Sequence, residues 1–186
     1  KIPFTPIAED DAPLLFLSRV ESIKGPDLAI EIARRSRRRL IIAGNAATSG
    51  AEAEFFSTRV APHLGRDRIE WIGEVDDSQK AKLLPHAAAL LVPIRWDEPF
   101  GIVFAEALAA GTPVISCARG ALPEIVRPGE TGWLIPENDI DAGVSAVARV
   151  PELNRTSCRQ DACMRFSVAA CTDQYIDLYR QMVPIR

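Results

Sequence analysis

The sequence is poor in the residues on which metal sites, disulfide frameworks and membrane spans depend. Its 186 residues include two histidines and four cysteines, and neither histidine lies near a cysteine or a carboxylate pair at the spacing of metal ligands. No apolar run approaches the ~20 residues of a membrane-spanning helix, and no signal peptide is visible. We therefore expect no metal site, no membrane span and a cytoplasmic location. The cysteines are expected to be buried or half-buried thiols: Cys117, Cys158, Cys163 and Cys171.

The sequence also lacks a large excess of either sign of charge, with 22 Lys and Arg against 25 Asp and Glu. The formal net charge is −3, so electrostatics favour neither nucleic acid nor an anionic membrane as a partner. One basic run, residues 34–39, has the composition of a nucleic-acid-binding or targeting segment. It lies at the C-terminal end of an expected helix, where cations complement the helix dipole, and we interpret it as a solvated helix end.

A glycine-rich dinucleotide fingerprint is missing as well. Gly44 follows an apolar run, but no further glycines stand at the spacing of such a fingerprint. This absence argues against an NAD-dependent oxidoreductase. The chain begins at Lys1 rather than at a methionine, which suggests that it is a segment of a longer protein.

What is present is a regular alternation of short apolar runs and helical segments. With 47% hydrophobic and 25% charged residues, the composition is that of one ordinary globular domain. Strands are expected at 14–17, 40–44, 69–72, 87–93, 114–116 and 132–135. Because helical segments separate them, the pattern predicts an α/β fold: a Rossmann-like, doubly wound parallel sheet of about six strands with helices on both faces. Right-handed crossovers would bring the loops that follow the strands to the carboxyl edge of the sheet.

Helix starts are marked by capping residues. Asp76, Asp77 and Ser78 are expected to cap the helix that runs through Leu84. The triplet Asp139-Ile140-Asp141 could cap a helix or form an acidic metal-binding motif, and the cap is favoured because Pro136 comes just before it. We also expect a helix over residues 51–64 and one or two amphipathic helices over residues 153–182.

The stretch Trp96 to Ser116 reads as a loop, a helix, a stop and a strand. Backbone amides of Gly101, Ile102 and Val103 should point out of the helix N-terminus, which favours a bound anion such as phosphate. Glu98 and Glu106 flank this junction, and because phosphate repels carboxylates, we expect them to bind neutral hydroxyl groups. The alternative is that Glu98 caps the helix and Glu106 is simply solvated.

Two further cations, Arg19 and Lys24, follow the first strand. In an open α/β sheet, ligands bind at the carboxyl ends of the strands, so these cations can meet the Glu98 junction across a switch point. Cations, a helix N-terminus and hydroxyl-binding carboxylates together suggest a nucleoside diphosphate that carries a sugar.

The motifs then resemble a known family. Segments LLFLSRVESIKGPDLAI, EWIGEVDD, AALLVPIRWDEPFGIVFAEALAAGTPVIS, ALPEIV, GETGWLI and FSVAACTDQYIDLYRQM are similar to the C-terminal, donor-binding domain of retaining GT-B glycosyltransferases of family four. The resemblance extends from about Leu14 to Met182, and Glu98 and Glu106 match the family's paired-glutamate motif. Pro99 and Ala121 depart from it, since glycine is common at both places.

The resemblance implies a role for each candidate residue. Arg19 and Lys24 would bind the donor diphosphate and stabilise its negative charge, Glu98 would hold the transferred sugar, and Glu106 would hold the ribose. Arg19, Lys24 and Glu98 are thereby the catalytic candidates. The remaining donor-binding candidates are Gly73, Glu74 and Val75 near the base, and Phe100, Gly101, Ile102 and Val103 at the helix N-terminus.

The resemblance also implies an organisation and an activity. Residues 1–186 would form one nucleotide-sugar-binding domain (13–168) with a C-terminal helix (169–183), and the N-terminal acceptor-binding domain would be absent. That domain would be a partner, and an exposed apolar face of Leu178, Tyr179 and Met182 would pack on it.

The expected function is the donor-binding half of a hexosyltransferase that moves a sugar from a nucleoside-diphosphate sugar to an acceptor hydroxyl. The donor is expected to be UDP-linked because such donors are common, no metal is required, and the acceptor is unknown. The segment alone is expected to be inactive. The alternative is a noncatalytic nucleotide or nucleotide-sugar binding module.

Overall fold

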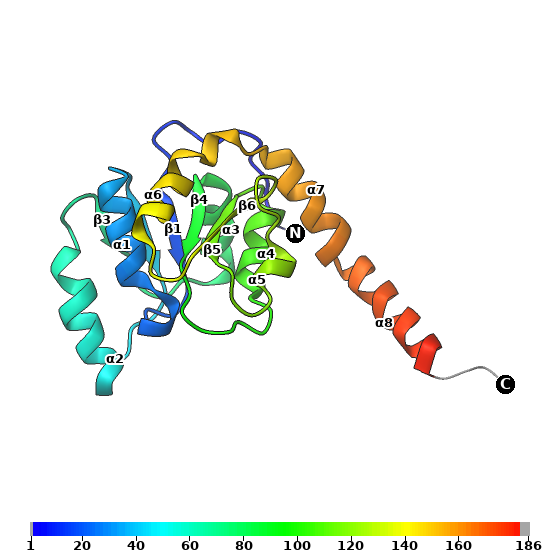
Figure 1. Cartoon of the computed structure of the whole chain (residues 1–186), viewed down its shortest axis with the longest axis horizontal. Coiled ribbons are helices and arrows are strands. Elements are labelled where there is room, and N and C mark those ends of the chain that lie inside the picture. Colours follow the sequence, from blue (N-terminus) through cyan, green and yellow to red (C-terminus); the bar gives the residue numbers. More distant parts are fainter. Residues whose placement is uncertain (1, 183–186) are drawn as a thin grey trace.

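The computed structural model describes residues 2–182, and its centre is a six-stranded sheet (Figure 1). The strand order is β3-β2-β1-β4-β5-β6, and every neighbouring pair is parallel. The prediction of a doubly wound parallel sheet is therefore confirmed. The strands are β1 (Leu14–Leu17), β2 (Leu40–Ala43), β3 (Ile69–Trp71), β4 (Ala89–Val92), β5 (Val114–Cys117) and β6 (Gly132–Ile135).

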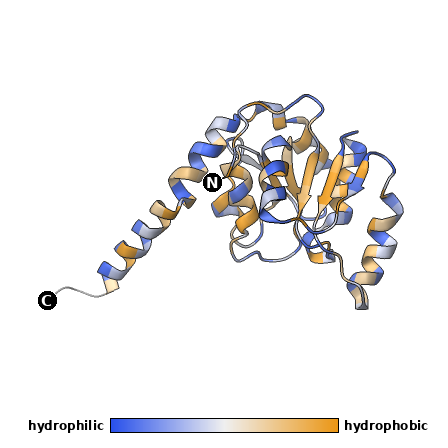
Figure 2. Ribbon diagram, turned by 180° about the vertical axis from the view of Figure 1, so that it is seen from behind, coloured by the Kyte–Doolittle hydropathy of each residue, from blue (hydrophilic) through white to orange (hydrophobic). Residues whose placement is uncertain are grey.

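Continuous apolar runs form the middle of the sheet because helices cover both of its faces. Every residue of β1, β4 and β5 is buried. The edge strand β3 differs: only Ile69 is buried, while Trp71 and the following Ile72 are each 37% exposed. In Figure 2 the central strands accordingly form the most hydrophobic part of the molecule.

Most of the longer helices form two layers around the sheet, whereas α8 extends away from it (Figure 1). Helices α1 and α6 pack against each other over one face, and α3, α4 and α7 pack together over the other. The longer helices are α1 (Pro26–Arg35), α3 (Asp77–His86), α4 (Ile102–Ala109), α6 (Ile140–Ala148), α7 (Arg155–Phe166) and α8 (Val168–Met182). Two shorter ones are α2 (Gly50–Phe55) and α5 (Leu122–Ile125).

Both capping predictions are confirmed. The Asp76 carboxylate accepts from the backbone N–H of Gln79, and the Gln79 side-chain oxygen accepts from the backbone N–H of Asp76. A complete capping box therefore starts α3. Asp139 accepts from the N–H of Ala142 at the start of α6. The acidic triplet at 139–141 therefore serves as a helix start.

One expected helix changes form, and the C-terminal region forms two helices, which agrees with the expectation of one or two. The predicted helix over 51–64 changes form: α2 is followed by a π-helical turn at Phe56–Val60 and a 3₁₀ turn at Ala61–His63. The C-terminal region forms two helices because Ser167 is extended, with φ −67° and ψ 155°. Helix α8 starts at Val168, one residue before the predicted boundary, and residue 183 lies outside the described residues.

The basic run at 34–39 forms ion pairs with nearby acidic residues. Arg34 binds Glu31 and Asp67, and Arg35 binds Glu31 and Asp141, with N–O distances of 2.7 to 3.0 Å. These contacts tie the end of α1 to α6 and to the loop before β3. The structure thus supports the interpretation of this run as a helix end.

The cysteine prediction is right for three residues and wrong for one. Cys117 and Cys158 are buried, and burial raises the pKa of each thiol to about 11. Cys171 is half-buried. Cys163 is exposed, because it lies on the outer side of α7.

Residues 2–13 run along the amino end of the sheet and are fixed there by Arg155 at the start of α7. The guanidinium donates to the carbonyl oxygens of Thr5, Pro85 and Ala87 at 2.7 to 2.9 Å, and to the hydroxyl of Thr112 at 2.9 Å. Arg155 is only 7% exposed, and its burial lowers the pKa of the guanidinium. This buried cation therefore joins the start of α7 to three other segments: the one around Thr5, the one from Pro85 to Ala87, and the one around Thr112.

Within residues 2–182 no helix has the length and hydropathy needed to cross a membrane. The same residues contain no group of three or more His, Cys, Asp or Glu arranged as metal ligands.

Candidate functional site

A groove of about 330 Å³ lies at the carboxyl edge of the sheet, between β1, β2 and the N-terminus of α4. The sheet order reverses direction next to β1, and in doubly wound folds this switch point is the usual place for a ligand. The groove therefore has the position that the sequence predicted for a site. Its lining residues are Leu17, Ser18, Ala43, Gly44, Asn45, Glu74, Val75, Lys80, Ile102, Val103 and Glu106.

Helix α4 presents an open N-terminus to this groove. Gly101 precedes it with φ +80°, and a Cβ atom there would lie 2.5 Å from the ring of Phe104, so glycine is required. No side chain among residues 2–182 caps this helix, which removes the alternative that Glu98 is its cap. The first amides of a helix have no intrahelical partner, so the N–H groups of Ile102 and Val103 have the geometry of an anion-binding helix end.

Glu106 forms an ion pair with Lys80. The Nζ atom of Lys80 lies 3.0 and 3.1 Å from the two carboxylate oxygens of Glu106, and 3.0 Å from Asp77. Burial lowers the pKa of Lys80, but the bonds to Glu106 and Asp77 outweigh that effect and leave it raised. Glu106 is thus held at the groove wall, and the alternative of a simply solvated side chain is wrong.

Glu98 forms a second ion pair, with Lys24. The Lys24 Nζ atom lies 2.7 Å from Glu98 Oε2, and the two side chains are 9% and 14% exposed. Trp96 Nε1 donates to the same oxygen at 3.1 Å, and the ammonium of Lys24 lies 4.2 Å from the centre of the Trp96 ring. The loop after β1 is therefore joined to the loop after β4, as the sequence predicted.

Arg19 occupies a different environment. Its side chain is 55% exposed, and it pairs with Glu21 at 2.7 Å. Arg19 and Lys24 thus follow the same strand, but only Lys24 is buried against the paired-glutamate segment.

The loop that carries Glu98 is packed tightly against the loop after β5. Gly120 has φ +53°, and a Cβ atom there would collide with the backbone of Glu98. The N–H of Ala121 donates to the Glu98 carbonyl at 2.8 Å. Ala121 itself is right-handed helical, with φ −77° and ψ −5°, so this departure from the family pattern causes no strain.

Of the other predicted donor-binding residues, some line the groove and some make contacts elsewhere. Glu74 and Val75 line the groove, while the Gly73 carbonyl accepts from the N–H of Gly44 at 2.7 Å and joins β2 to the chain after β3. The Phe100 side chain instead packs edge-on against Phe166, with ring centres 5.7 Å apart. Phe100 therefore faces the C-terminal helices rather than the groove.

Lys80 is a groove residue that the sequence analysis missed. It is separated from Glu106 by 26 residues, so no local spacing indicates their contact. The capping residues at 76–79 could have indicated Lys80, because they place it at the start of the helix that follows β3, and that helix start lies at the carboxyl edge of the sheet.

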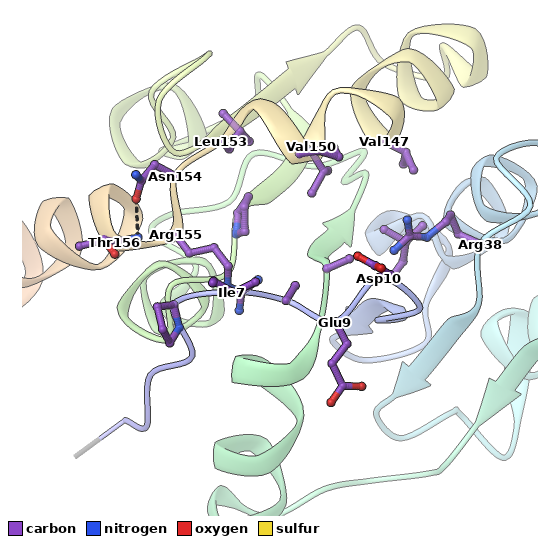
Figure 3. A pocket seen from close by; sticks show the side chains of 16 residues that line it. Ile7, Glu9, Asp10, Arg38, Val147, Val150, Leu153, Asn154, Arg155 and Thr156 are labelled. Carbon is purple, nitrogen blue, oxygen red and sulfur yellow. Dashed lines mark hydrogen bonds between the residues drawn. The ribbon is translucent and has the colours of Figure 1, made fainter.

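A second cavity, of about 540 Å³, lies at the opposite end of the sheet (Figure 3). Figure 3 shows Ile7, Glu9 and Asp10 of the leading segment below it, and Val147, Val150 and Leu153 above it. None of the predicted site residues lines this cavity. It has a larger volume than the groove, but it lies at the edge of the sheet away from the loops that follow the strands.

Comparison with known proteins identifies the family. Residues 1–164 match the model of the family described as Glycosyl transferases group 1. The D-inositol 3-phosphate glycosyltransferase of Saccharomonospora viridis is 31% identical over 189 residues, which cover 94% of this chain and 44% of that protein.

Solved structures agree with that match. AviGT4, a glycosyltransferase involved in avilamycin A biosynthesis, superposes with a TM-score of 0.78 at 29% identity, covering 95% of this chain and 52% of AviGT4. HepE of Anabaena, in complex with UDP-glucose, has the same fold with a TM-score of 0.78 at 18% identity, covering 92% and 49%.

The chain spans about half the length of the proteins that it matches. Its sheet order and the segment around Glu98 and Glu106 are those expected from the C-terminal domain of GT-B enzymes. The chain belongs to the group 1 glycosyltransferases, and it has the Rossmann-like fold of their C-terminal, donor-binding domain.

Proposed function

We propose that this chain binds the nucleoside-diphosphate sugar for a retaining glycosyltransferase that transfers the sugar to an acceptor hydroxyl. The observation that supports this most is the open N-terminus of α4, with Glu106 and Lys80 beside it in one groove. An anion-binding helix end and a hydroxyl-binding carboxylate at one site suit a ligand with a phosphate next to a ribose. The donor is a UDP-sugar, as in the HepE complex.

The proposed chemistry follows from the charges around this site. Breaking the bond between the sugar and the diphosphate places negative charge on the leaving phosphate. Lys24, Arg19 and the amides at the start of α4 would stabilise that charge, which is the largest catalytic contribution in many enzymes. Lys24 is bonded to Glu98 before a ligand arrives, but its ammonium has further donors for the diphosphate, and Glu98 has further acceptor positions for a hydroxyl of the sugar.

Nucleotide binding without transfer is the expected behaviour of the 186-residue chain. A ligand that binds the folded state raises the unfolding temperature by mass action, so UDP and UDP-glucose should do so in metal-free buffer, more than GDP, ADP or NAD. Sugar transfer should be undetectable, since both reactants must be held together and water excluded. Transfer should appear when the remainder of a full-length relative is supplied.

Thermal-shift measurements and a product assay check these expectations. Failure of every nucleotide to shift the unfolding temperature would contradict the proposed function. Transfer by this chain alone would contradict the requirement for a separate acceptor domain. Nucleotide binding without transfer by the complete protein would favour the noncatalytic binding module.

The two glutamates should be separable by their ligands. Glu106→Gln should weaken binding of both UDP and UDP-glucose, because both carry the ribose, whereas Glu98→Gln should weaken chiefly UDP-glucose. A hydrogen bond to a charged group contributes roughly 1.5–3 kcal/mol, so each affected affinity should fall on the order of tenfold or more. Calorimetry with both ligands measures this. Glu54→Gln, an exposed carboxylate on α2, is the control, and equal losses for the two ligands in Glu98→Gln would remove its role in binding the sugar.

A further inference from the structure

Lys80 has no role in the function proposed so far, although it lies in the groove. It comes from α3, whereas the carboxylate that it binds comes from α4, so the contact joins two helices over the same face of the sheet. Its ammonium contacts both oxygens of Glu106, and its side chain is 25% exposed, against 23% for Glu106. Asp77, whose side chain is 96% exposed, also contacts this ammonium, at 3.0 Å.

This geometry fixes one side of the Glu106 carboxylate and leaves the other available. A carboxylate has about four lone-pair positions on its two oxygens, and the Lys80 ammonium takes one on each oxygen. The remaining positions can accept from a pair of neighbouring hydroxyls, which is what a ribose presents. Without Lys80, the flexible glutamate side chain would have no hydrogen-bond partner among residues 2–182 to hold it in this orientation.

The charge of Lys80 matters for the same reason. Glu106 shares the groove with Ile102 and Val103, whose amides are the expected diphosphate site. An unpaired carboxylate there would repel a diphosphate, since like charges at close range oppose binding. Lys80, which Asp77 also contacts, offsets part of the negative charge at Glu106 and leaves some of its acceptor positions free.

We propose that Lys80 is a positioning residue that orients Glu106 toward the ribose hydroxyls and so determines the preference for ribonucleotides over nucleotides without those hydroxyls. The inference rests on the proposed function, because it assumes that the groove holds the ribose of the donor. Lys80 itself need not touch the ribose.

The test compares UDP with 2′,3′-dideoxy-UDP by calorimetry. The unmodified chain should bind UDP on the order of tenfold or more tightly than the dideoxy analogue, because the analogue leaves Glu106 without its hydroxyl partners. Lys80→Gln should reduce this ratio to about twofold or less, and Lys80→Arg should largely restore it, since arginine can also bind both carboxylate oxygens. Lys82→Gln, on the same helix and exposed, is the matched control and should keep the full ratio.

The outcomes distinguish failure of the positioning role from failure of the proposed function. A ratio that stays unchanged in Lys80→Gln, or a loss of affinity that is equal for both ligands, would overturn the positioning role while leaving the proposed function intact. Absence of UDP binding by the unmodified chain would overturn the proposed function and this inference together. Unfolding temperatures of all variants, measured without ligand, show whether a changed ratio comes from a folded protein.

Discussion

Lys24→Met is expected to weaken binding of UDP and UDP-glucose by roughly ten- to a hundredfold, and to destabilise the ligand-free chain as well. The affinity falls because a charge-assisted bond to the diphosphate is lost, which is worth roughly 1.5–3 kcal/mol. The stability falls because Glu98, whose side chain is 14% exposed, keeps its charge but loses its cation. Removing one partner of a largely buried pair costs about 2–3 kcal/mol when some solvent remains in reach.

A double-mutant cycle separates these effects. Glu98→Gln in the Lys24→Met background should recover part of the lost stability, because the carboxylate without a partner is then neutral. It should not recover nucleotide affinity. Urea unfolding and calorimetry measure the two quantities, and Lys82→Met on α3 serves as the control for loss of a lysine. Full nucleotide affinity in Lys24→Met would show that the diphosphate binds elsewhere.

Arg155→Met should lower the free energy of unfolding by about 3 kcal/mol without affecting nucleotide affinity. Its removal leaves the carbonyls of Thr5, Pro85 and Ala87 without their donor, and an unsatisfied buried acceptor costs roughly 1–3 kcal/mol. Loss of the desolvated charge offsets part of this total, since burial disfavours the cation. For a chain of this size, about 3 kcal/mol corresponds to a decrease of roughly 6–12 °C in the unfolding temperature.

Differential scanning calorimetry checks the Arg155 prediction. Arg180→Met is the matched control, because Arg180 is exposed on α8 and pairs only with Asp177 at 3.1 Å among the residues that the structure describes. An unchanged unfolding temperature in Arg155→Met would mean that water replaces the guanidinium at no cost. A loss of UDP affinity would mean that the amino end of the sheet is coupled to the groove.

The strand positions and the sheet type were predictable because both depend on local patterns. Runs such as Leu14–Leu17 and Val114–Cys117 are wholly or mostly apolar, and such runs are typical of strands in a parallel sheet that helices cover on both faces. Capping residues were equally local, so Asp76 and Asp139 could be placed in advance. The position of Gly101 before α4 follows from the same kind of signal.

Contacts between distant segments were not predictable from local patterns. The Lys80–Glu106 pair joins residues separated by 26 positions, and no local pattern indicates it. For Lys24 and Glu98, separated by 74 positions, the expected sheet topology indicated that their loops can meet, but not that the two side chains form an ion pair. The orientation of Phe100 toward Phe166 depends on how α7 packs, which the periodicity of α7 does not specify. The π-helical turn at Phe56–Val60 has no simple sequence signature either.

The paired charges described above have a consequence for which ligands the protein can accept. Arg19, Lys24 and Lys80 each already have a carboxylate partner, at 2.7, 2.7 and 3.0 Å. A free phosphate would meet a lysine whose charge a carboxylate already offsets, and a free sugar would meet a carboxylate that already has a lysine partner. A molecule that brings hydroxyls and phosphates together can give Lys24 and Glu98 new partners in one event. We therefore expect the site to bind a nucleoside-diphosphate sugar more tightly than it binds free phosphate or a free sugar, because only the first ligand carries both chemical groups.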